Sequence, residues 1–115
     1  MKIAIVGSRK FNDYDTICRF IEQRFDLDQI DAVVSGGAKG VDALAERYAR
    51  DHHLELIVKS ANWAKYGRAA GPIRNKLIVE EADAIVAFPA AESVGTYNTI
   101  SLAQKLGKKL EVCNV

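Results

Sequence analysis

The chain has 115 residues, of which 49% are hydrophobic and 27% are charged, and its formal net charge is +1. This length and composition fit one globular domain (1–115) with a real core, and exclude disordered, collagen-like and membrane-spanning chains. A near-neutral charge gives no whole-protein electrostatic argument for nucleic-acid binding, but it does not exclude a local basic patch.

Short apolar runs, typical of buried strands, alternate along the chain with segments whose apolar residues recur at helical spacing. In chain order we expect strand 2–6, helix 14–25, strand 31–35, helix 40–52, strand 54–58, an irregular segment 60–71, helix 72–82, strand 84–88, helix 96–106 and strand 109–113. This alternation predicts an α/β fold: a three-layer, Rossmann-like open sheet of about five mainly parallel strands with helices on both faces.

The first ten residues, MKIAIVGSRK, contain an apolar run that stops at Gly7. They lack the longer apolar region and the cleavage site of a signal peptide, so we expect a cytoplasmic protein with no membrane partner. Cys18 and Cys113 do not form a metal-ligand spacing and are expected as small buried apolar side chains. We expect no metal and no resident cofactor.

Glycines, hydroxyl groups and cations follow three of the expected strands. The first strand leads into Gly7-Ser8-Arg9, the second into residues 36–40 (GGAKG), and the fourth into a loop ending in residues 93–96 (SVGT). Open α/β sheets bind ligands at the carboxyl ends of their strands. Glycine permits close backbone approach, and the N–H groups at a helix start attract phosphate. The pattern therefore predicts a site for a phosphate-bearing ligand.

The candidate ligand-binding residues lie at this edge or carry groups that could reach it. They are Gly7, Ser8, Arg9, Gly36, Gly37, Lys39, Gly40, Asp42, Arg74, Asn75, Ser93, Gly95 and Thr96. We expect Arg74 to pair with phosphate, because its planar fork suits that geometry. Asn75 is expected to fix a ribose hydroxyl or a base edge, and Asp42 to order the glycine loop from the helix start.

Further cations and two aromatic residues belong to the same region. Lys10, Arg68 and Lys76 are expected to add positive charge near the site. Trp63 and Tyr66 fit either a lid over the core or a platform on which bases stack. The sequence leaves these two interpretations of the aromatic pair open.

Four segments in order, GSRKF, VVSGGAKGVDALAERYA, AAGPIRNKLIVEEADAIVAF and SVGTYNTISLAQKLGKKLEV, resemble the successive motifs of the SLOG superfamily, which is named for the SMF/DprA and LOG proteins. The resemblance runs almost end to end and indicates the small single-domain YspA-like members found in bacteria and phages. It implies a Rossmann-like sheet and a nucleotide-derived ligand.

The resemblance implies three candidate functions. Retained phosphate loops favour binding of a nucleotide or an ADP-ribose-like derivative, by a sensor or a sequestering protein. LOG-like members hydrolyse the N-glycosidic bond of nucleoside monophosphates, but Thr99 stands where their catalytic Glu would be, so Asp42 and Glu92 are the nearby carboxylates and no catalytic residue is assigned. DprA-like members bind single-stranded DNA. Homo-oligomerisation is common in the superfamily and is left open here.

Overall fold

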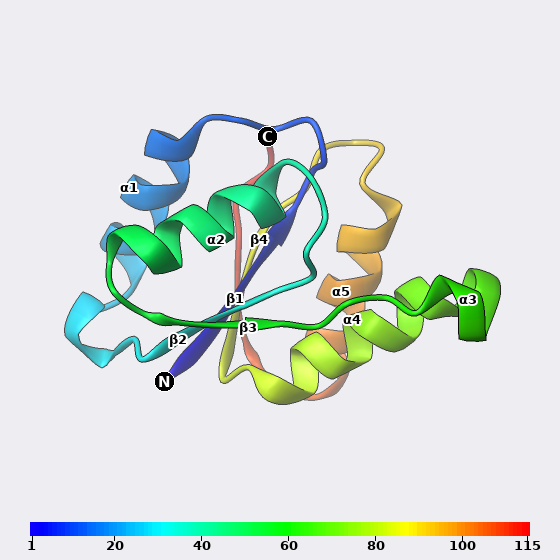
Figure 1. Ribbon diagram of the computed structural model, residues 1–115. Helices are drawn as coiled ribbons and strands as arrows, with labels where there is room; N and C mark the ends of the chain where they lie inside the picture. Colours follow the sequence, from blue (N-terminus) through cyan, green and yellow to red (C-terminus); the bar gives the residue numbers. More distant parts are fainter.

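The computed structural model describes all 115 residues as strands and helices that alternate along the chain (Figure 1). In chain order the elements are β1 (Lys2–Gly7), α1 (Tyr14–Arg24), η1 (Leu27–Gln29), β2 (Ala32–Ser35), α2 (Val41–Asp51), β3 (Glu55–Val58), α3 (Trp63–Tyr66), η2 (Gly67–Ala69), α4 (Ala70–Glu81), β4 (Ala84–Phe88), α5 (Val94–Lys105) and β5 (Lys109–Val112). Every strand and long helix expected from the sequence is present, with ends shifted by one or two residues.

Segment 60–71 differs from the expectation of an irregular connection. It contains the single-turn helix α3, the 3-10 turn η2 and the start of α4. The side chain of Asn62 caps α3, with its Oδ1 accepting a hydrogen bond from the Lys65 N–H at 3.1 Å. Turns this short contain too few residues for apolar periodicity to reveal them.

The five strands form one sheet in the order β3-β2-β1-β4-β5, and all neighbours run parallel. The strand order reverses between β1 and β4, which is the point at which open α/β sheets bind ligands. Gly7 pairs with Phe88 at the end of these two strands, and the Ser8 N–H donates to the Phe88 carbonyl at 3.0 Å. The loops that follow β1 and β4 therefore begin side by side at the carboxyl edge of the sheet.

Helices cover both faces of the sheet, with α1 and α2 on one side and α4 and α5 on the other (Figure 1). Alternate residues of β1 serve the two layers. Ile3 and Ile5 belong to the core under α1 and α2, and Ala4 and Val6 belong to the core under α4 and α5. This is the three-layer Rossmann-like arrangement expected from the sequence.

The edge strands are less buried than the central ones. β2 and β4 are buried along their whole length, whereas Leu56 and Val58 of β3 are exposed. Cys18 and Cys113 are partly buried against the core and unpaired, rather than fully buried as expected. No helix combines the length and the apolar character that crossing a bilayer requires.

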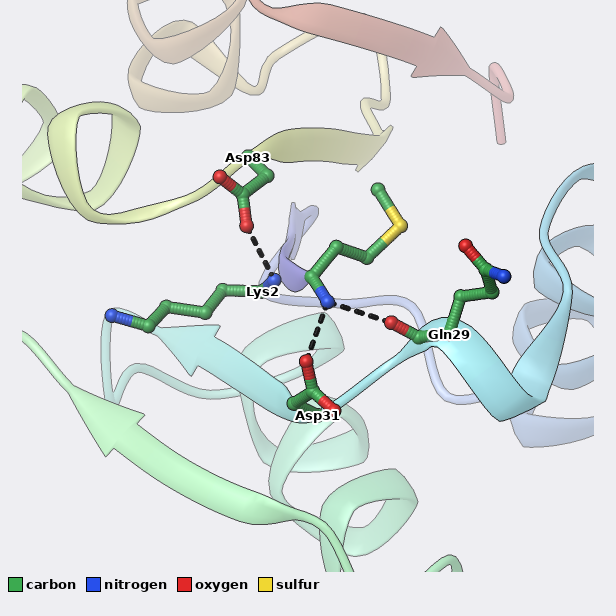
Figure 2. Close-up of polar contacts among 5 residues, drawn as sticks. Lys2, Gln29, Asp31 and Asp83 are labelled. Carbon is green, nitrogen blue, oxygen red and sulfur yellow. Dashed lines mark hydrogen bonds and ion pairs between the residues drawn. The ribbon is translucent and has the colours of Figure 1, made fainter.

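The amino ends of the strands are closed by hydrogen bonds and ion pairs. Figure 2 shows the terminal amino group of Met1 donating to the Gln29 carbonyl at 2.7 Å and to Asp31 Oδ2 at 2.6 Å. The backbone N–H of Lys2 donates to Asp83 Oδ2 at 2.8 Å. The residues that immediately precede β2 and β4 thus accept hydrogen bonds from the donors at the start of β1.

Candidate functional site

The loops after β1, β2 and β4, the middle of α4 and the start of α5 enclose a cleft of about 340 Å³ at the carboxyl edge of the sheet. Polar and small residues from these segments make up most of its wall. The lining residues are Val6, Gly7, Ser8, Arg9, Lys10, Ala38, Asp42, Arg74, Asn75, Ile78, Glu92, Ser93, Val94, Gly95, Thr96 and Thr99. Nine of the thirteen residues expected from the sequence therefore meet in one cleft.

Gly40 joins the second loop to the first instead of lining the cleft. Its φ is +68°, and a Cβ there would overlap the backbone of Ser8 and Arg9. The next residue, Val41, donates its N–H to the Ser8 carbonyl at 3.0 Å. Only glycine satisfies both the backbone conformation and the close approach. We therefore assign Gly40 a structural role in place of the ligand contact expected from the sequence.

Asp42 lies behind the glycine loop at the start of α2 and is only 7% exposed. Its Oδ2 accepts a hydrogen bond from the Ala38 N–H at 3.1 Å, so its carboxylate holds the loop from the helix. Burial raises the pKa of Asp42 above its usual value, although the Ala38 N–H and the nearby Arg74 oppose that rise. The cleft thus contains an acidic group of its own beside the cations.

Arg74 reaches from α4 to the second loop. Its Nη1 donates to the Gly36 carbonyl at 2.8 Å and its Nε donates to Asn75 Oδ1 at 3.0 Å. A Cβ on Gly36 would stand 2.8 Å from Arg74 Nη1 and 2.9 Å from Asp42 Oδ2, so this approach depends on the glycine. No carboxylate forms an ion pair with Arg74, and its Nη2 makes no hydrogen bond within the protein.

Asn75 is buried and joins α4 to the start of α5. Its Nδ2 donates to the Gly95 carbonyl at 3.2 Å and to Asn98 Oδ1 at 3.0 Å, while its Oδ1 accepts from Arg74. Both amide hydrogens are therefore used inside the protein. Asn75 thus has a structural role, and its expected contact with a ribose hydroxyl or a base edge, which could use only its Oδ1, stays a prediction.

The first turn of α5 presents unpartnered donors to the cleft. The backbone N–H groups of Gly95 and Thr96 form no hydrogen bond within the protein, and no side chain caps the helix. Ser93 Oγ instead accepts from the Ala90 N–H at 3.0 Å. Thr99, at the position of the LOG glutamate, is buried and donates to the Gly95 carbonyl at 3.1 Å. The helix start therefore presents a positive end with two free N–H groups, and no carboxylate caps it, although the exposed Glu92 lines the same cleft.

A second hollow of about 610 Å³ adjoins the cleft. The two share Arg9, Ala38 and Arg74, and the second hollow also contains Gly36, Gly37 and Lys39 of the glycine loop. Its remaining lining residues are Ser60, Ala61 and Trp63. Twelve of the thirteen expected residues thus line one hollow or the other, and Gly40 alone lines neither.

The aromatic pair does not form a lid over the core. Trp63 is 54% exposed and borders the second hollow, whereas Tyr66 is 40% exposed and lines neither hollow. The expected cation Lys10 lines the cleft, while Arg68 and Lys76 are exposed and lie outside both hollows.

Sequence reasoning missed the contribution of the third strand. Ser60 and Ala61 line the second hollow and follow β3 almost directly. The rule that placed ligands after the first, second and fourth strands applies equally to the third. Their small side chains do not indicate a binding site, but their position directly after a strand could have predicted it.

The chain is similar in sequence to known proteins. A sequence model of the YspA, cpYpsA-related SLOG family matches residues 1–66. The Gene 61 protein of Mycobacterium phage D29 is 33% identical over 113 residues, which is 92% of this chain and 90% of that protein.

Two solved structures share the fold. DNA processing protein A (DprA) from Streptococcus pneumoniae matches 96% of this chain with a TM-score of 0.77 and 20% identity. DprA from Helicobacter pylori, described for its single-stranded DNA binding mode, matches 97% of this chain with a TM-score of 0.70 and 22% identity. The matched part is 49% of the first DprA chain and 64% of the second, less than two thirds of either.

Proposed function

The chain belongs to the YspA, cpYpsA-related SLOG family, and from that premise we propose that it binds a phosphate-bearing nucleotide or nucleotide derivative, as a sensor or a sequestering protein. One observation carries the proposal. The N–H groups of Gly95 and Thr96 have no partner and belong to residues that line the same cleft as Arg9 and Arg74. A helix start with free donors beside cations is a favourable environment for phosphate.

The charges around the cleft support an anionic ligand. Arg9, Lys10 and Arg74 line it, and none of them takes part in an ion pair within the protein. The backbone N–H of Arg9 also lacks an internal partner, and the Ser8 hydroxyl accepts from Lys10 N–H at 3.2 Å while keeping its own proton to donate. These groups would replace the water around a phosphate with fixed donors.

The size of the site favours a nucleotide over inorganic phosphate. The cleft and the adjoining hollow have volumes of about 340 and 610 Å³ and share three residues. Sites for small organic ligands commonly fall between about 300 and 1,000 Å³. A phosphate alone would leave most of this connected space filled with water.

Titration calorimetry and thermal shift with nucleoside mono- and diphosphates and ADP-ribose test the proposal. A ligand at 100 times its Kd should stabilise the fold by about 2.7 kcal/mol, a shift of several degrees. We expect Arg74→Ala to weaken binding about 10- to 100-fold, because a hydrogen bond to a charged group is lost.

Lys76→Ala is the matched control for Arg74→Ala, because Lys76 is a cation on the same helix that lines neither hollow. It should bind the nucleotide as the wild type does. Absence of binding by every nucleotide in the panel, or equal losses in the two variants, would contradict the proposed site.

Single-stranded DNA is a second candidate ligand, favoured by the DprA-like fold and by the exposed Trp63 beside cations in the second hollow. It predicts binding of a short DNA strand that weakens steeply as salt rises. Binding that is absent or insensitive to salt would remove it. Hydrolysis of an N-glycosidic bond is not proposed, because Thr99 supplies no carboxylate and its hydroxyl donates to the Gly95 carbonyl. Of the two carboxylates that line the cleft, Asp42 is buried and holds the Ala38 N–H, and Glu92 is exposed.

A further inference from the structure

The exposed indole of Trp63 belongs to the second hollow, and the phosphate cleft does not use it. We propose that Trp63 stacks on the base of the nucleotide whose phosphate lies in the cleft. This inference rests on the proposed function and adds to it a base subsite in the second hollow. It divides the ligand between two connected spaces, with the phosphate at the start of α5 and the base beside α3.

Continuity of the two spaces is the first support. Arg9, Ala38 and Arg74 line both the cleft and the second hollow, so they form the boundary between them. Arg74 is fixed at this boundary by its bond to the Gly36 carbonyl. A nucleotide with its phosphate near Arg74 therefore has a direct path for its sugar and base toward Trp63.

The placement of Trp63 is the second support. It opens α3, whose first turn is capped by Asn62, and its ring atom Cη2 lies 3.4 Å from the position a Cβ would occupy on Gly71. The indole is thus backed by the first turn of α4. It nevertheless remains 54% exposed, which leaves a large apolar surface in water that a stacked base would cover.

The remaining walls of the hollow suit a flat ring. Gly36, Gly37, Ala38, Ser60 and Ala61 are all small, so they leave open space in front of the indole. Lys39 adds a cation at the same hollow without an internal ion pair. Stacking on an aromatic side chain accepts any base, because every base has a flat π-face.

Trp63 is the only tryptophan of the chain, so its fluorescence reports on this hollow directly. The probes are ADP, GDP and UDP, with inorganic pyrophosphate as the ligand without a base and a short dT oligomer as the source of nucleotide units in a strand. We expect the nucleotides or the oligomer to quench the emission, while pyrophosphate binds with little quenching. Whether free nucleotide or oligomer quenches identifies the source of the base.

Calorimetry on Trp63→Ala supplies the second readout. Affinity for the quenching nucleotide should fall about 5- to 150-fold, the range for loss of one stacked base, while affinity for pyrophosphate stays unchanged. Trp63→Phe should recover part of the loss. Tyr66→Ala is the control, because this exposed aromatic lies outside both hollows.

The outcomes separate this inference from the proposed function. Nucleotide binding that depends on Arg74 but neither quenches Trp63 nor weakens in Trp63→Ala would overturn the base subsite and leave the phosphate site standing. Equal loss of nucleotide and pyrophosphate affinity in Trp63→Ala would also overturn it. Failure of every probe to bind the wild type would overturn both.

Discussion

The two edges of the sheet differ in how their polar groups are satisfied. At the amino edge, the Met1 amino group and the Lys2 N–H donate to the carboxylates of Asp31 and Asp83 at 2.6 and 2.8 Å (Figure 2). The Lys2 ammonium donates to Glu81 Oε2 at 2.8 Å. At the carboxyl edge, Arg9 and Arg74 have no carboxylate partner, and the Gly95 and Thr96 N–H groups have no acceptor. The donors of the first edge are paired within the protein, whereas several donors of the second edge are free, as the proposed phosphate site requires.

This difference does not mean that the amino edge carries most of the stability. Its ion pairs are exposed in part to water, and exposed pairs contribute little to the free energy of unfolding. The fold depends mainly on the two apolar layers on either side of the sheet. Substitutions of charged groups at the carboxyl edge should therefore change ligand binding more than they change the free energy of unfolding.

The largest expected effect on stability comes from the glycine that joins the two loops of the carboxyl edge. Gly40→Ala should lower the free energy of unfolding by about 3 kcal/mol, because it combines a left-handed backbone with overlap of the Ser8 and Arg9 backbone. Urea denaturation measures the change.

Gly95→Ala is the matched control at the same edge. A Cβ on Gly95 meets nothing within 4 Å and replaces a helical glycine, so stability should rise by up to about 1 kcal/mol. A destabilised Gly95→Ala, or a tolerated Gly40→Ala, would show that the two glycines have been assigned the wrong roles.

Asp42 is the buried acidic group of the carboxyl edge, and Asp42→Asn removes its charge while keeping an acceptor for the Ala38 N–H. We expect nucleotide affinity near neutral pH to increase several-fold, about 1 kcal/mol, because repulsion of the phosphate is relieved. Calorimetry measures the gain. A loss of affinity would instead indicate that the carboxylate binds the ligand directly.

The same variant has a distinct pH dependence. Burial raises the pKa of Asp42 in the folded state above the usual 3.8, so its stabilising contribution is complete below pH 3.8 and is lost as pH rises through the raised value. Asp42→Asn should therefore gain stability relative to the wild type across that interval. Urea denaturation of both proteins from acid to neutral pH checks this; a constant difference would contradict it.

Tyr48 has an unpartnered polar group of a different kind, because its hydroxyl is enclosed in the core and does not line the cleft. Its hydroxyl lies in the core with no hydrogen-bond partner, and burial raises its pKa to about 12. Tyr48→Phe should raise the free energy of unfolding by about 1 kcal/mol and leave nucleotide affinity unchanged. Tyr14→Phe, which loses a 2.9 Å hydrogen bond to Asp51, should give no such gain in a thermal melt.

The smallest effect is expected at the amino edge. Lys2→Ala removes the 2.8 Å ion pair with Glu81 and should lower the free energy of unfolding only slightly, because the pair is exposed to water. Nucleotide affinity should not change, because this edge is opposite the proposed site. A clear loss of affinity, measured by calorimetry, would show that the two edges are not functionally separate.

The sequence was sufficient to predict most of the fold because apolar periodicity records which residues face the sheet. Ile3, Ala4, Ile5 and Val6 form one apolar run because they serve two layers at once. The carboxyl edge was also predictable, since strand ends bearing glycines meet there in any parallel sheet. The exposure of β3 could not be predicted, because apolar residues do not reveal which strand lies at an edge.

The roles of individual residues in the site could be assigned only from the structure. Gly40 and Gly36 are the same residue type in the same loop, but one approaches backbone and the other approaches Arg74 and Asp42. The sequence predicted that Asn75 contacts the ligand, and it could not show that both amide hydrogens of Asn75 are donated to Gly95 and Asn98. Such assignments depend on distances between segments far apart in the chain, which composition and spacing do not encode.

Amide chemical shifts test the contrast between the two edges most directly. We would titrate ¹⁵N-labelled protein with the nucleoside diphosphate that binds most tightly and follow the N–H signals of Arg9, Gly95, Thr96, Asp31 and Asp83. The account predicts large, saturable shifts of the first three and little change at the two aspartates of the amino edge. Saturable binding that shifts the aspartate signals and leaves Gly95 and Thr96 unchanged would contradict it.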